Sequence, residues 1–453
     1  MSYKPDPTKN VNLTINGMPV TVPEGTRILE AARLVNVDIP VLCDHPELCK
    51  RALCRICMVE YDPRGKPVTA CGNDVWEGVN VITNNERLFN IRKTILEMIL
   101  ADHPQDCLSC IRNTKCELQK LAYTHCISET PFENESGTKP KIIEADTIVR
   151  DMDKCVKCNR CVEVCQEHQT IRAINTSHRS HEYEICTAYK QPLEETPCVF
   201  CGGCAAICPV GAIYEHDQTP EVWKALNDSS IKTMAQVAPA LVSVMERELG
   251  VSLTIGKVVA ALKMLGFKKV YEARIAINAI SSEISNEVKS RKDKLPVISG
   301  CADGVTRFIK QSYPDLETNL TASKNLRQMF SSLFKAGFAK EAGVDVSKIV
   351  SVLLVPCLTQ KYSAKPDKTD FAISAKEFSR MIKLSGIMIE TLPDEPFDVV
   401  NCDLPKQADP VKKLVVHGYA NARKVMEDIR SGKCETQWVE IMSCPEGKGC
   451  VKP

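Results

Sequence analysis

The chain has 453 residues, which is long enough for three or four domains. Its 58 basic and 57 acidic side chains nearly balance, and this balance excludes a polyanionic partner. It has no apolar signal core and no run of about 20 apolar residues, so we expect neither a membrane span nor a nucleic-acid or membrane partner. Its 24 cysteines predict a cytoplasmic chain, because thiols in a reducing compartment bind metals rather than form disulfides.

The first residues predict a small β-grasp unit. Val11–Ile15 alternates between apolar and polar residues, an Asn-Gly pair predicts a hairpin turn, and Pro19–Val22 predicts the returning strand. Thr26–Leu34 then has helical periodicity. This order of elements is typical of a β-grasp ferredoxin, and we assign such a domain to residues 1–80.

Four thiols in this region have spacing suited to a [2Fe–2S] cluster: Cys43, Cys54, Cys57 and Cys71. The first gap is longer than in plant-type ferredoxins, and Cys49 lies within it as an alternative to Cys43. We favour Cys43 because Cys43-Asp-His-Pro-Glu-Leu resembles the first-ligand loop of complex I and hydrogenase relatives. Those relatives usually have Gly two residues before the second ligand, where this chain has Ala52.

A mixed set of one imidazole and three thiols follows a helix predicted over Glu86–Leu100. The pattern His-x3-Cys-x2-Cys-x5-Cys contains His103, Cys107, Cys110 and Cys116. It resembles the His-ligated cubane of the same families. A neutral imidazole in place of a thiolate changes the net charge of a cluster and therefore its potential. We assign residues 81–140 to a His-ligated [4Fe–4S] domain.

The pattern Cys-x2-Cys-x2-Cys-x3-Cys then occurs twice, as a first comb beginning at Cys155 and a second comb beginning at Cys198. In bacterial-type ferredoxins the fourth thiolate of each such comb binds the cluster of the other comb. The sequence therefore predicts one cubane on Cys155, Cys158, Cys161 and Cys208, and a second on Cys198, Cys201, Cys204 and Cys165. A disulfide or zinc module is the alternative. We assign residues 141–220 to a twin [4Fe–4S] ferredoxin domain.

The order of these sites resembles the N-terminal half of [FeFe]-hydrogenases, including the large subunit of electron-bifurcating ones. The complex I electron-input subunit shares parts of it. In the second half, the resemblance rests on the segments Thr254–Tyr271, Tyr313–Phe330, Val416–Arg423 and Glu440–Pro445. It implies a hydrogenase-like α/β domain over residues 221–453. The fold class is therefore a multidomain chain of α+β and α/β units.

The motifs of the diiron site depart from this family. In the first motif, Thr-Ser-Cys-Cys-Pro-x-Trp, Gly300 replaces the thiol that shuttles protons. In the second, Pro-Cys-x-x-Lys-x-x-Glu, Gln360 replaces the lysine that pairs with a cyanide ligand. The third, Met-Ala-Cys-x-x-Gly-Cys, begins here as Met442-Ser-Cys444 and has Lys448 in place of the bridging cysteine. We therefore expect no diiron H-cluster and no hydrogen chemistry.

Apolar runs predict buried parallel strands at Val297–Ile298, Ile349–Val355 and Trp438–Met442. A cysteine lies just beyond each carboxyl end, where ligand-binding groups converge in open α/β sheets. We expect a fourth [4Fe–4S] cluster on Cys301, Cys357, Cys444 and Cys450, with Cys450 replacing the lost bridging ligand. Cys402 and Cys434 compete with Cys450 as fourth ligand. Free thiols or a structural zinc are the alternatives to a cluster.

The resemblance implies an iron–sulfur electron-transfer subunit of a cytosolic, flavin-based oxidoreductase complex, with no catalytic residues of its own. No Gly-x-Gly-x-x-Gly follows a predicted strand, so nucleotides are expected on partner chains. In bifurcating relatives the partners are a flavin/NAD-binding subunit and a small thioredoxin-like [2Fe–2S] subunit. We expect both here, together with soluble ferredoxin and an NADP-binding subunit. The complex would be an electron-bifurcating transhydrogenase linking NAD(H), ferredoxin and NADP(H).

Three other functions fit parts of the sequence. The first is an electron-input subunit of an NAD/ferredoxin-dependent formate dehydrogenase, which would differ only in its partner. The second is a redox sensor, against which the lack of a signalling or DNA-binding module speaks. The third is a working hydrogenase with substituted ligands, against which Gly300 and Lys448 speak.

Overall fold

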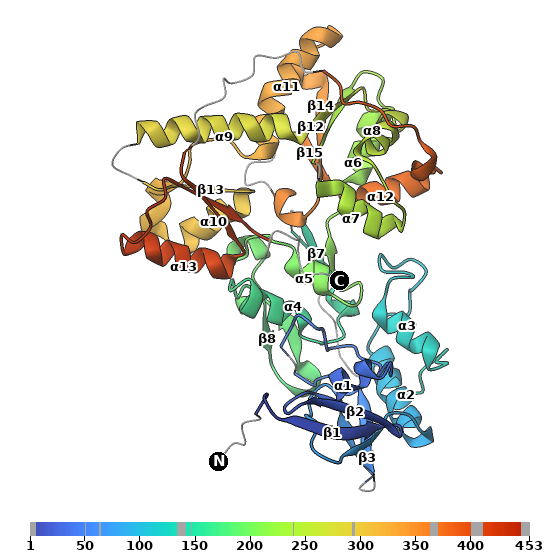
Figure 1. Cartoon of the computed structure of the whole chain (residues 1–453). Coiled ribbons are helices and arrows are strands. Elements are labelled where there is room, and N and C mark those ends of the chain that lie inside the picture. Colours follow the sequence, from blue (N-terminus) through green and yellow to red (C-terminus); the bar gives the residue numbers. More distant parts are fainter. Residues whose placement is uncertain are drawn as a thin grey trace.

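The computed structural model describes residues 6–49, 51–62, 65–133, 142–145, 147–238, 240–291, 295–362, 370–399 and 411–444 (Figure 1). Within these ranges, no helix has both the length and the apolar character needed to cross a bilayer. The N-terminal sheet lies at one end of the molecule and the parallel sheets of the second half lie at the other (Figure 1).

The N-terminal sheet has the strand order β2-β1-β5-β3-β4. Its strands are β1 (Asn10–Ile15), β2 (Met18–Pro23), β3 (Met58–Asp62), β4 (Lys66–Thr69) and β5 (Asn80–Ile82). The predicted hairpin is confirmed, since β1 and β2 pair antiparallel around Asn16 and Gly17. Both turn residues have positive φ, 50° and 79°, as a two-residue type I′ turn requires. Helix α1 (Ile28–Leu34) covers this sheet with four buried residues.

Two helices connect this sheet to the middle of the chain. Helix α2 (Glu86–Ala101) confirms the predicted helix, and Asn85 caps it by accepting a hydrogen bond from the Leu88 amide at 2.8 Å. Helix α3 (Glu117–Thr124) begins directly after Cys116. Both helices bury only part of their surface, against the sheet and the middle region.

The middle region contains little regular structure and surrounds the two combs. It has a three-stranded sheet of order β10-β7-β6, a hairpin and two short helices. These are β6 (Ile143–Glu144), β7 (Ile148–Arg150), β10 (Ile213–Glu215), β8 (Asn175–Ser177), β9 (Glu184–Cys186), α4 (Arg160–Glu163) and α5 (Gly203–Ile207). Helices α4 and α5 each carry the third cysteine of one comb.

The second half is built on two parallel sheets. The larger has the order β12-β11-β14-β15 and contains β11 (Lys232–Val237), β12 (Lys269–Glu272), β14 (Ile349–Val355) and β15 (Asp370–Ser374). The smaller has the order β13-β17-β16 and contains β13 (Val297–Gly300), β16 (Lys413–His417) and β17 (Trp438–Met442). The three predicted parallel strands are confirmed. They belong to two sheets, however, because β14 lies in the larger sheet and β13 and β17 in the smaller.

Helices cover both faces of the larger sheet, which explains why every residue of β14 is buried. The helices on one face are α6 (Thr219–Asn227), α7 (Ala240–Leu249), α8 (Ile255–Met264) and α12 (Ala375–Leu384). Those on the other are α9 (Ala273–Ser290) and α11 (Leu326–Ala342). Helices α10 (Asp303–Ser312) and α13 (Tyr419–Arg430) flank the smaller sheet.

Short turns of helix occur in the connections. They are 3₁₀ turns at Met152–Lys154, Ser180–Glu182, Ala188–Lys190, Leu193–Glu195, Pro314–Asn319, Val346–Lys348, Leu358–Gln360 and Ile389–Thr391, and a π-helical turn at Val164–His168. One apolar core joins the middle region to the smaller sheet, because Ile207 of the second comb packs in the same cluster as Phe308 and Ile441.

Candidate iron–sulfur sites

The structure brings the first four predicted ligands together at one end of the N-terminal sheet. The sulfur atoms of Cys57 and Cys71 lie 3.3 Å apart, and the amide of Cys54 lies 3.5 Å from the sulfur of Cys43. Hydrogen bonds from Cys54 and Cys71 lower the pKa of the Cys43 thiol. The alternative ligand, Cys49, is exposed. These contacts group Cys43 with the other three thiols.

The loop between Cys43 and Cys57 turns through two left-handed residues. Ala52 has φ 51° and Arg55 has φ 61°. The left-handed region is favourable for glycine and costs an L-residue about 1–2 kcal/mol. Glycine at position 52 would adopt the same backbone conformation without this cost.

The His103 set lies where α2 ends and α3 begins. The amide of His103 bonds to the carbonyl of Leu100 at 3.1 Å, and its Nδ1 is buried. Burial raises the pKa of the Cys116 thiol, and the nearby Cys110 and Cys107 raise it further. The three thiols are therefore neighbours. The backbone contact of His103 places this residue beside the loop of the three thiols, and its role as a ligand stays a prediction.

The two combs lie side by side, and each contributes one cysteine to the thiol group of the other; cluster binding by these groups stays a prediction. The negative charge of a Cys208 thiolate raises the pKa of the Cys155, Cys158 and Cys161 thiols, so Cys208 lies close to all three. In the other group, the negative charge of a Cys165 thiolate raises the pKa of the Cys198, Cys201 and Cys204 thiols. Each fourth cysteine thus lies with the first three cysteines of the other comb. Burial is the largest effect on the first three thiols of each comb, and it raises the pKa of Cys155 to about 11 and that of Cys201 to about 12.

Two buried arginines near these thiols were not anticipated from the sequence. Arg150 is 2% exposed, and its charge lowers the pKa of Cys155 and Cys204 against the larger, opposite effect of burial. Arg160 is 3% exposed and donates to both carboxylate oxygens of Glu117 at 2.7 Å. Arg160 also donates to the carbonyl of Asp44 at 2.9 Å. The sequence signal for Arg150 is a charged residue in an otherwise apolar short strand, whereas Arg160 shares its comb with Lys157 and Glu163 and has no such signal.

Three of the C-terminal thiols, Cys301, Cys357 and Cys444, are also neighbours. Cys301 follows β13 and Cys444 follows β17, and the amide of Cys301 bonds to the carbonyl of Ile441 at 3.1 Å. Burial raises the pKa of Cys357 to about 12, and the charges of Cys301 and Cys444 contribute to the same shift. Cys357 reaches this group from the end of β14, so two sheets supply the three thiols.

The position of Cys434 bears on which cysteine is the fourth ligand of this group. Cys450 and Cys402 lie outside the described residues, as does Lys448. Cys434 precedes β17 whereas Cys444 follows it, so the two thiols flank opposite ends of a five-residue strand. A strand of that length spans about 17 Å. This separation argues against Cys434 as the fourth ligand.

The donor chemistry of these sets fits iron–sulfur clusters. They consist of grouped thiols, each buried or half-buried, which as thiolates are soft ligands suited to iron–sulfur centres. Within the described ranges, no group of three or more His, Cys, Asp or Glu side chains has the geometry to hold a single metal ion. Because burial favours the protonated thiols, cluster binding must drive proton release.

Comparison with known proteins gives four family matches in chain order. A "2Fe-2S iron-sulfur cluster binding domain" matches residues 8–86, and an "NADH-ubiquinone oxidoreductase-G iron-sulfur binding region" matches residues 92–131. An "NADH-quinone oxidoreductase subunit 3, ferredoxin-like domain" matches residues 145–214. An "Iron only hydrogenase large subunit, C-terminal domain" matches residues 231–409 and 398–452.

Two hydrogenase relatives are similar to this chain over most of its length. The NADP-reducing hydrogenase subunit HndD of Solidesulfovibrio fructosivorans is 32% identical over 96% of this chain and 87% of its own length. The chain belongs to the iron-only hydrogenase large-subunit family. Iron hydrogenase 1 of Clostridium pasteurianum is 28% identical over 85% of this chain and 70% of its own length. The NADPH-Fe(3+) oxidoreductase subunit alpha of Geobacter sulfurreducens is 34% identical over 45% of this chain and 24% of its own length.

This hydrogenase-family chain has no room for a side chain at Gly300. A Cβ atom built on Gly300 would lie 2.3 Å from the Cβ of Val305, which is itself fully buried. The Val305 side chain thus occupies the space into which a residue at position 300 would project. Gly300, Cys301 and Gln360 line a cavity of about 430 Å³. The side-chain oxygen of Gln360 is buried there without a hydrogen-bond partner in the described structure.

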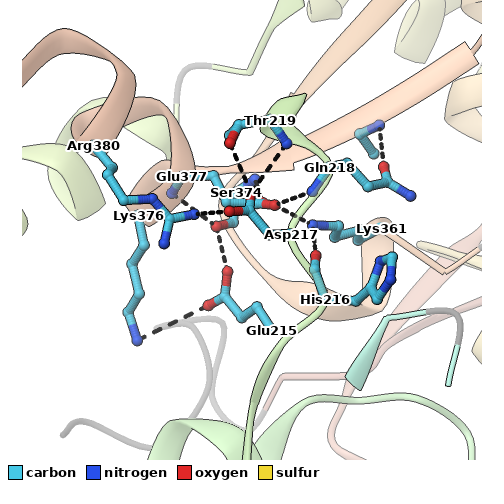
Figure 2. Close-up of polar contacts among 11 residues, drawn as sticks. Glu215, His216, Asp217, Gln218, Thr219, Lys361, Ser374, Lys376, Glu377 and Arg380 are labelled. Atoms are coloured by element: carbon cyan, nitrogen blue, oxygen red, sulfur yellow. Dashed lines mark hydrogen bonds and ion pairs between the residues drawn. The ribbon is translucent and has the colours of Figure 1, made fainter. Parts of the chain in front are cut away.

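Lys361 follows Gln360 but points away from this cavity. Its ammonium group lies 2.5 Å from Glu377 and 2.5 Å from the carbonyl of His216, and both paired side chains are buried (Figure 2). Glu377 also accepts from the amides of Gln218 at 2.9 Å and Ser374 at 2.6 Å. Lys361 of this hydrogenase-family chain is therefore committed to a structural ion pair outside the cavity that Gln360 lines.

The second comb packs directly on the C-terminal domain. Gly202 has φ 76°, and a Cβ there would lie 2.5 Å from the side chain of Leu358. The hydroxyl of Thr359 donates to the carbonyl of Cys201 at 3.3 Å. Arg307 of α10 donates to the carbonyl of Cys198 at 2.7 Å. The backbone of the second comb therefore touches the segment that carries Cys357.

Proposed function

We propose that this chain is the electron-transfer subunit of a cytoplasmic, flavin-based complex that exchanges electrons between NAD(H), ferredoxin and NADP(H) sites on partner proteins, without hydrogen chemistry. The partners would be a flavin/NAD-binding subunit, a small thioredoxin-like [2Fe–2S] subunit and an NADP-binding subunit, with soluble ferredoxin as exchange partner. The names of two relatives, a NADP-reducing hydrogenase and an NADPH-Fe(3+) oxidoreductase, support a nicotinamide-linked complex.

One observation carries the proposal. Near Cys301 the thiols are retained as a group, whereas the space beside Gly300 is filled by Val305. The loss of a purely vestigial site would affect the thiols and the neighbouring positions alike. Here the thiols remain grouped while Val305 fills the space beside Gly300. This combination fits a site that still holds a cluster but no diiron unit.

The residues of the chain would act as ligands and as their environment. When bound, the clusters supply one-electron transfer. Cys43, Cys54, Cys57 and Cys71 would hold the [2Fe–2S] cluster, and His103 with Cys107, Cys110 and Cys116 the first cubane. The combs would hold two cubanes and the C-terminal thiols a fourth. Burial of these thiols excludes water, and Arg150 and Arg160 place positive charge beside them.

The test is iron per chain in anaerobically purified protein, with infrared spectroscopy on the same sample. The proposal expects about 18 irons and no carbonyl or cyanide bands. About 20 irons with those bands would identify a working diiron site and refute the proposal. About 14 irons would show that the C-terminal thiols hold no cluster.

Partner identity has its own test. Affinity purification from the native organism should recover flavin-containing and nicotinamide-binding chains in fixed proportion. Recovery of a formate dehydrogenase catalytic chain instead would reassign the acceptor while leaving the electron-transfer role of this chain in place.

A further inference from the structure

Two buried hydroxyl groups form a chain of hydrogen bonds to one of the C-terminal thiols. The Ser443 hydroxyl lies 3.4 Å from the sulfur of Cys301, and the Ser443 amide donates to the same sulfur at 3.5 Å. The phenol oxygen of Tyr419 lies 3.0 Å from the Ser443 hydroxyl. Ser443 is 3% exposed and Tyr419 is fully buried, so water does not compete for these bonds.

If Cys301 is a thiolate ligand, its charge state determines which group donates in each of these hydrogen bonds. A thiolate carries no proton and can only accept, so the Ser443 hydroxyl must donate to the sulfur. Ser443 then accepts from the phenol of Tyr419, and each bond polarises the next. The sulfur therefore receives two hydrogen bonds from one residue, one from its amide and one from its hydroxyl.

Tyr419 lies next to the second comb, so this series of hydrogen bonds extends from Cys301 towards that comb. Tyr419 is the first residue of α13, and its ring lies 4.9 Å from that of Phe308 on α10. A Cβ atom on Gly304 would lie 2.3 Å from the carbonyl oxygen of Val199 and 3.5 Å from the phenol oxygen of Tyr419. The phenol thus occupies the buried space between the second comb and Cys301.

The hydroxyl at position 443 is a feature of this chain rather than of the hydrogenase motif. The motif Met-Ala-Cys has an alanine where this chain has Ser443. A buried hydroxyl pair can serve simply to satisfy its own polar atoms in a core. Here, however, the pair ends on the sulfur of a proposed ligand, and hydrogen bonds to cluster sulfur are one means of setting reduction potential.

We propose that Ser443 raises the reduction potential of the cluster at Cys301, Cys357 and Cys444 by donating hydrogen bonds to the Cys301 sulfur, and that Tyr419 strengthens this effect by donating to the Ser443 hydroxyl. A reduced cluster carries more negative charge than an oxidised one, so a donor to its sulfur stabilises the reduced state more. The inference rests on the proposed function, because it requires a cluster at these thiols. Both residues act through Cys301 and are positioning residues.

The test is a redox titration of the anaerobically purified full chain, followed by EPR, with iron counted on each sample. Ser443→Ala, which restores the residue of the family motif, should shift the midpoint of the C-terminal cluster to lower potential. Tyr419→Phe should shift it in the same direction by less, because the Ser443 hydroxyl remains. The other midpoints and the iron count should stay unchanged in both variants.

Tyr313→Phe is the matched control, because Tyr313 is also buried and its ring also packs on Phe308, at 5.6 Å. It should leave every midpoint in place. Unchanged midpoints in both test variants, with the iron count preserved, would overturn the tuning role alone. An unmodified chain with only about 14 irons would overturn the proposed C-terminal cluster and the tuning role with it. If Ser443→Ala loses iron, the midpoint shift of Tyr419→Phe alone decides whether the hydrogen bonds raise the potential of the C-terminal cluster.

Discussion

Arg150 places a buried positive charge between the two interleaved comb sites. It is one of the largest fully enclosed side chains in the described structure, and it donates to the carbonyl of Ile185 at 2.9 Å. Its charge acts on Cys155 in one thiol group and on Cys204 in the other. A cation held in low dielectric stabilises added electrons at both sites.

We predict that Arg150→Leu lowers the midpoint potentials of both comb cubanes in an EPR-monitored redox titration. The reduced clusters lose a stabilising charge, while the thiol ligands stay in place. Arg172→Leu is the control, because Arg172 is exposed on the same region of the chain. Equal shifts in the two variants would indicate a general charge effect and contradict a specific role of Arg150.

A second prediction separates the two candidates for the first [2Fe–2S] ligand. Cys43→Ser should remove the [2Fe–2S] EPR signal and about two irons per chain. Cys49→Ser should leave both unchanged, because Cys49 is exposed and the three other thiols group with Cys43. The reverse result would assign the ligand to Cys49.

A third prediction concerns the imidazole. His103→Cys adds a negative ligand, so the midpoint of one cubane should shift to lower potential with the iron count unchanged. The measurement is the same redox titration, with the remaining clusters as internal references. If neither the EPR spectrum nor any midpoint changes, His103 is not a ligand.

At the scale of elements, residues at and after the end of β10 bind the middle region to α12 through hydrogen bonds and ion pairs. Glu377 of α12 closes a capping box with Ser374 and also accepts from the Gln218 amide. Asp217 lies 2.9 Å from Arg380, and Glu215 contacts Ser374 (Figure 2). The buried Lys361–Glu377 pair at the centre therefore couples three segments that are distant in sequence.

We predict that Lys361→Met weakens this junction by about 3–5 kcal/mol, because it leaves a buried carboxylate without its cation. Hydrogen exchange of the α12 amides should report the loss as faster local opening. Arg380→Met is the matched control. Its pair with Asp217 is 37% and 41% exposed, so we expect a loss of no more than about 1 kcal/mol. Equal effects would show that burial does not set the strength of the pair.

The elements that were predictable are those with strong local signals. The Asn-Gly turn and the long amphipathic α2 were predictable because turn chemistry and period are encoded locally. The division of the parallel strands between two sheets was not, because β13 and β14 carry similar apolar runs. The cysteine spacing predicted the interleaving of the combs. Arg150, Ser443 and Tyr419 escaped prediction because their roles depend on contacts between distant segments.

At the scale of the whole molecule, the second comb and the C-terminal domain form a continuous unit. Arg307 of α10 donates to the carbonyls of Cys198 at 2.7 Å and Thr196 at 2.9 Å, and contacts the carbonyl of Glu194. Phe200 stacks on Tyr362 with ring centroids 4.3 Å apart. Ligand loops of two proposed clusters are thus held against each other by side chains from both regions.

We predict that Arg307→Ala separates the unfolding of these two regions. Hydrogen bonds to a charged group contribute about 1.5–3 kcal/mol each, so the variant should expose residues 194–201 to faster hydrogen exchange. Lys310→Ala on the same helix is the control, because its pair with Glu317 is about half exposed. Unchanged exchange at residues 194–201 in Arg307→Ala would contradict a joint unit.

The contact between Gly300 and Val305 also constrains the ancestry of the chain. A single substitution cannot reinstate a thiol at position 300, because its Cβ would meet Val305 at 2.3 Å. Val305 would first have to shrink, and that step alone leaves a cavity in a packed core. Every intermediate on the return route is therefore less stable than the present sequence. A cysteine at position 300 therefore requires at least two coupled substitutions, and we expect neither of them alone to be neutral for stability.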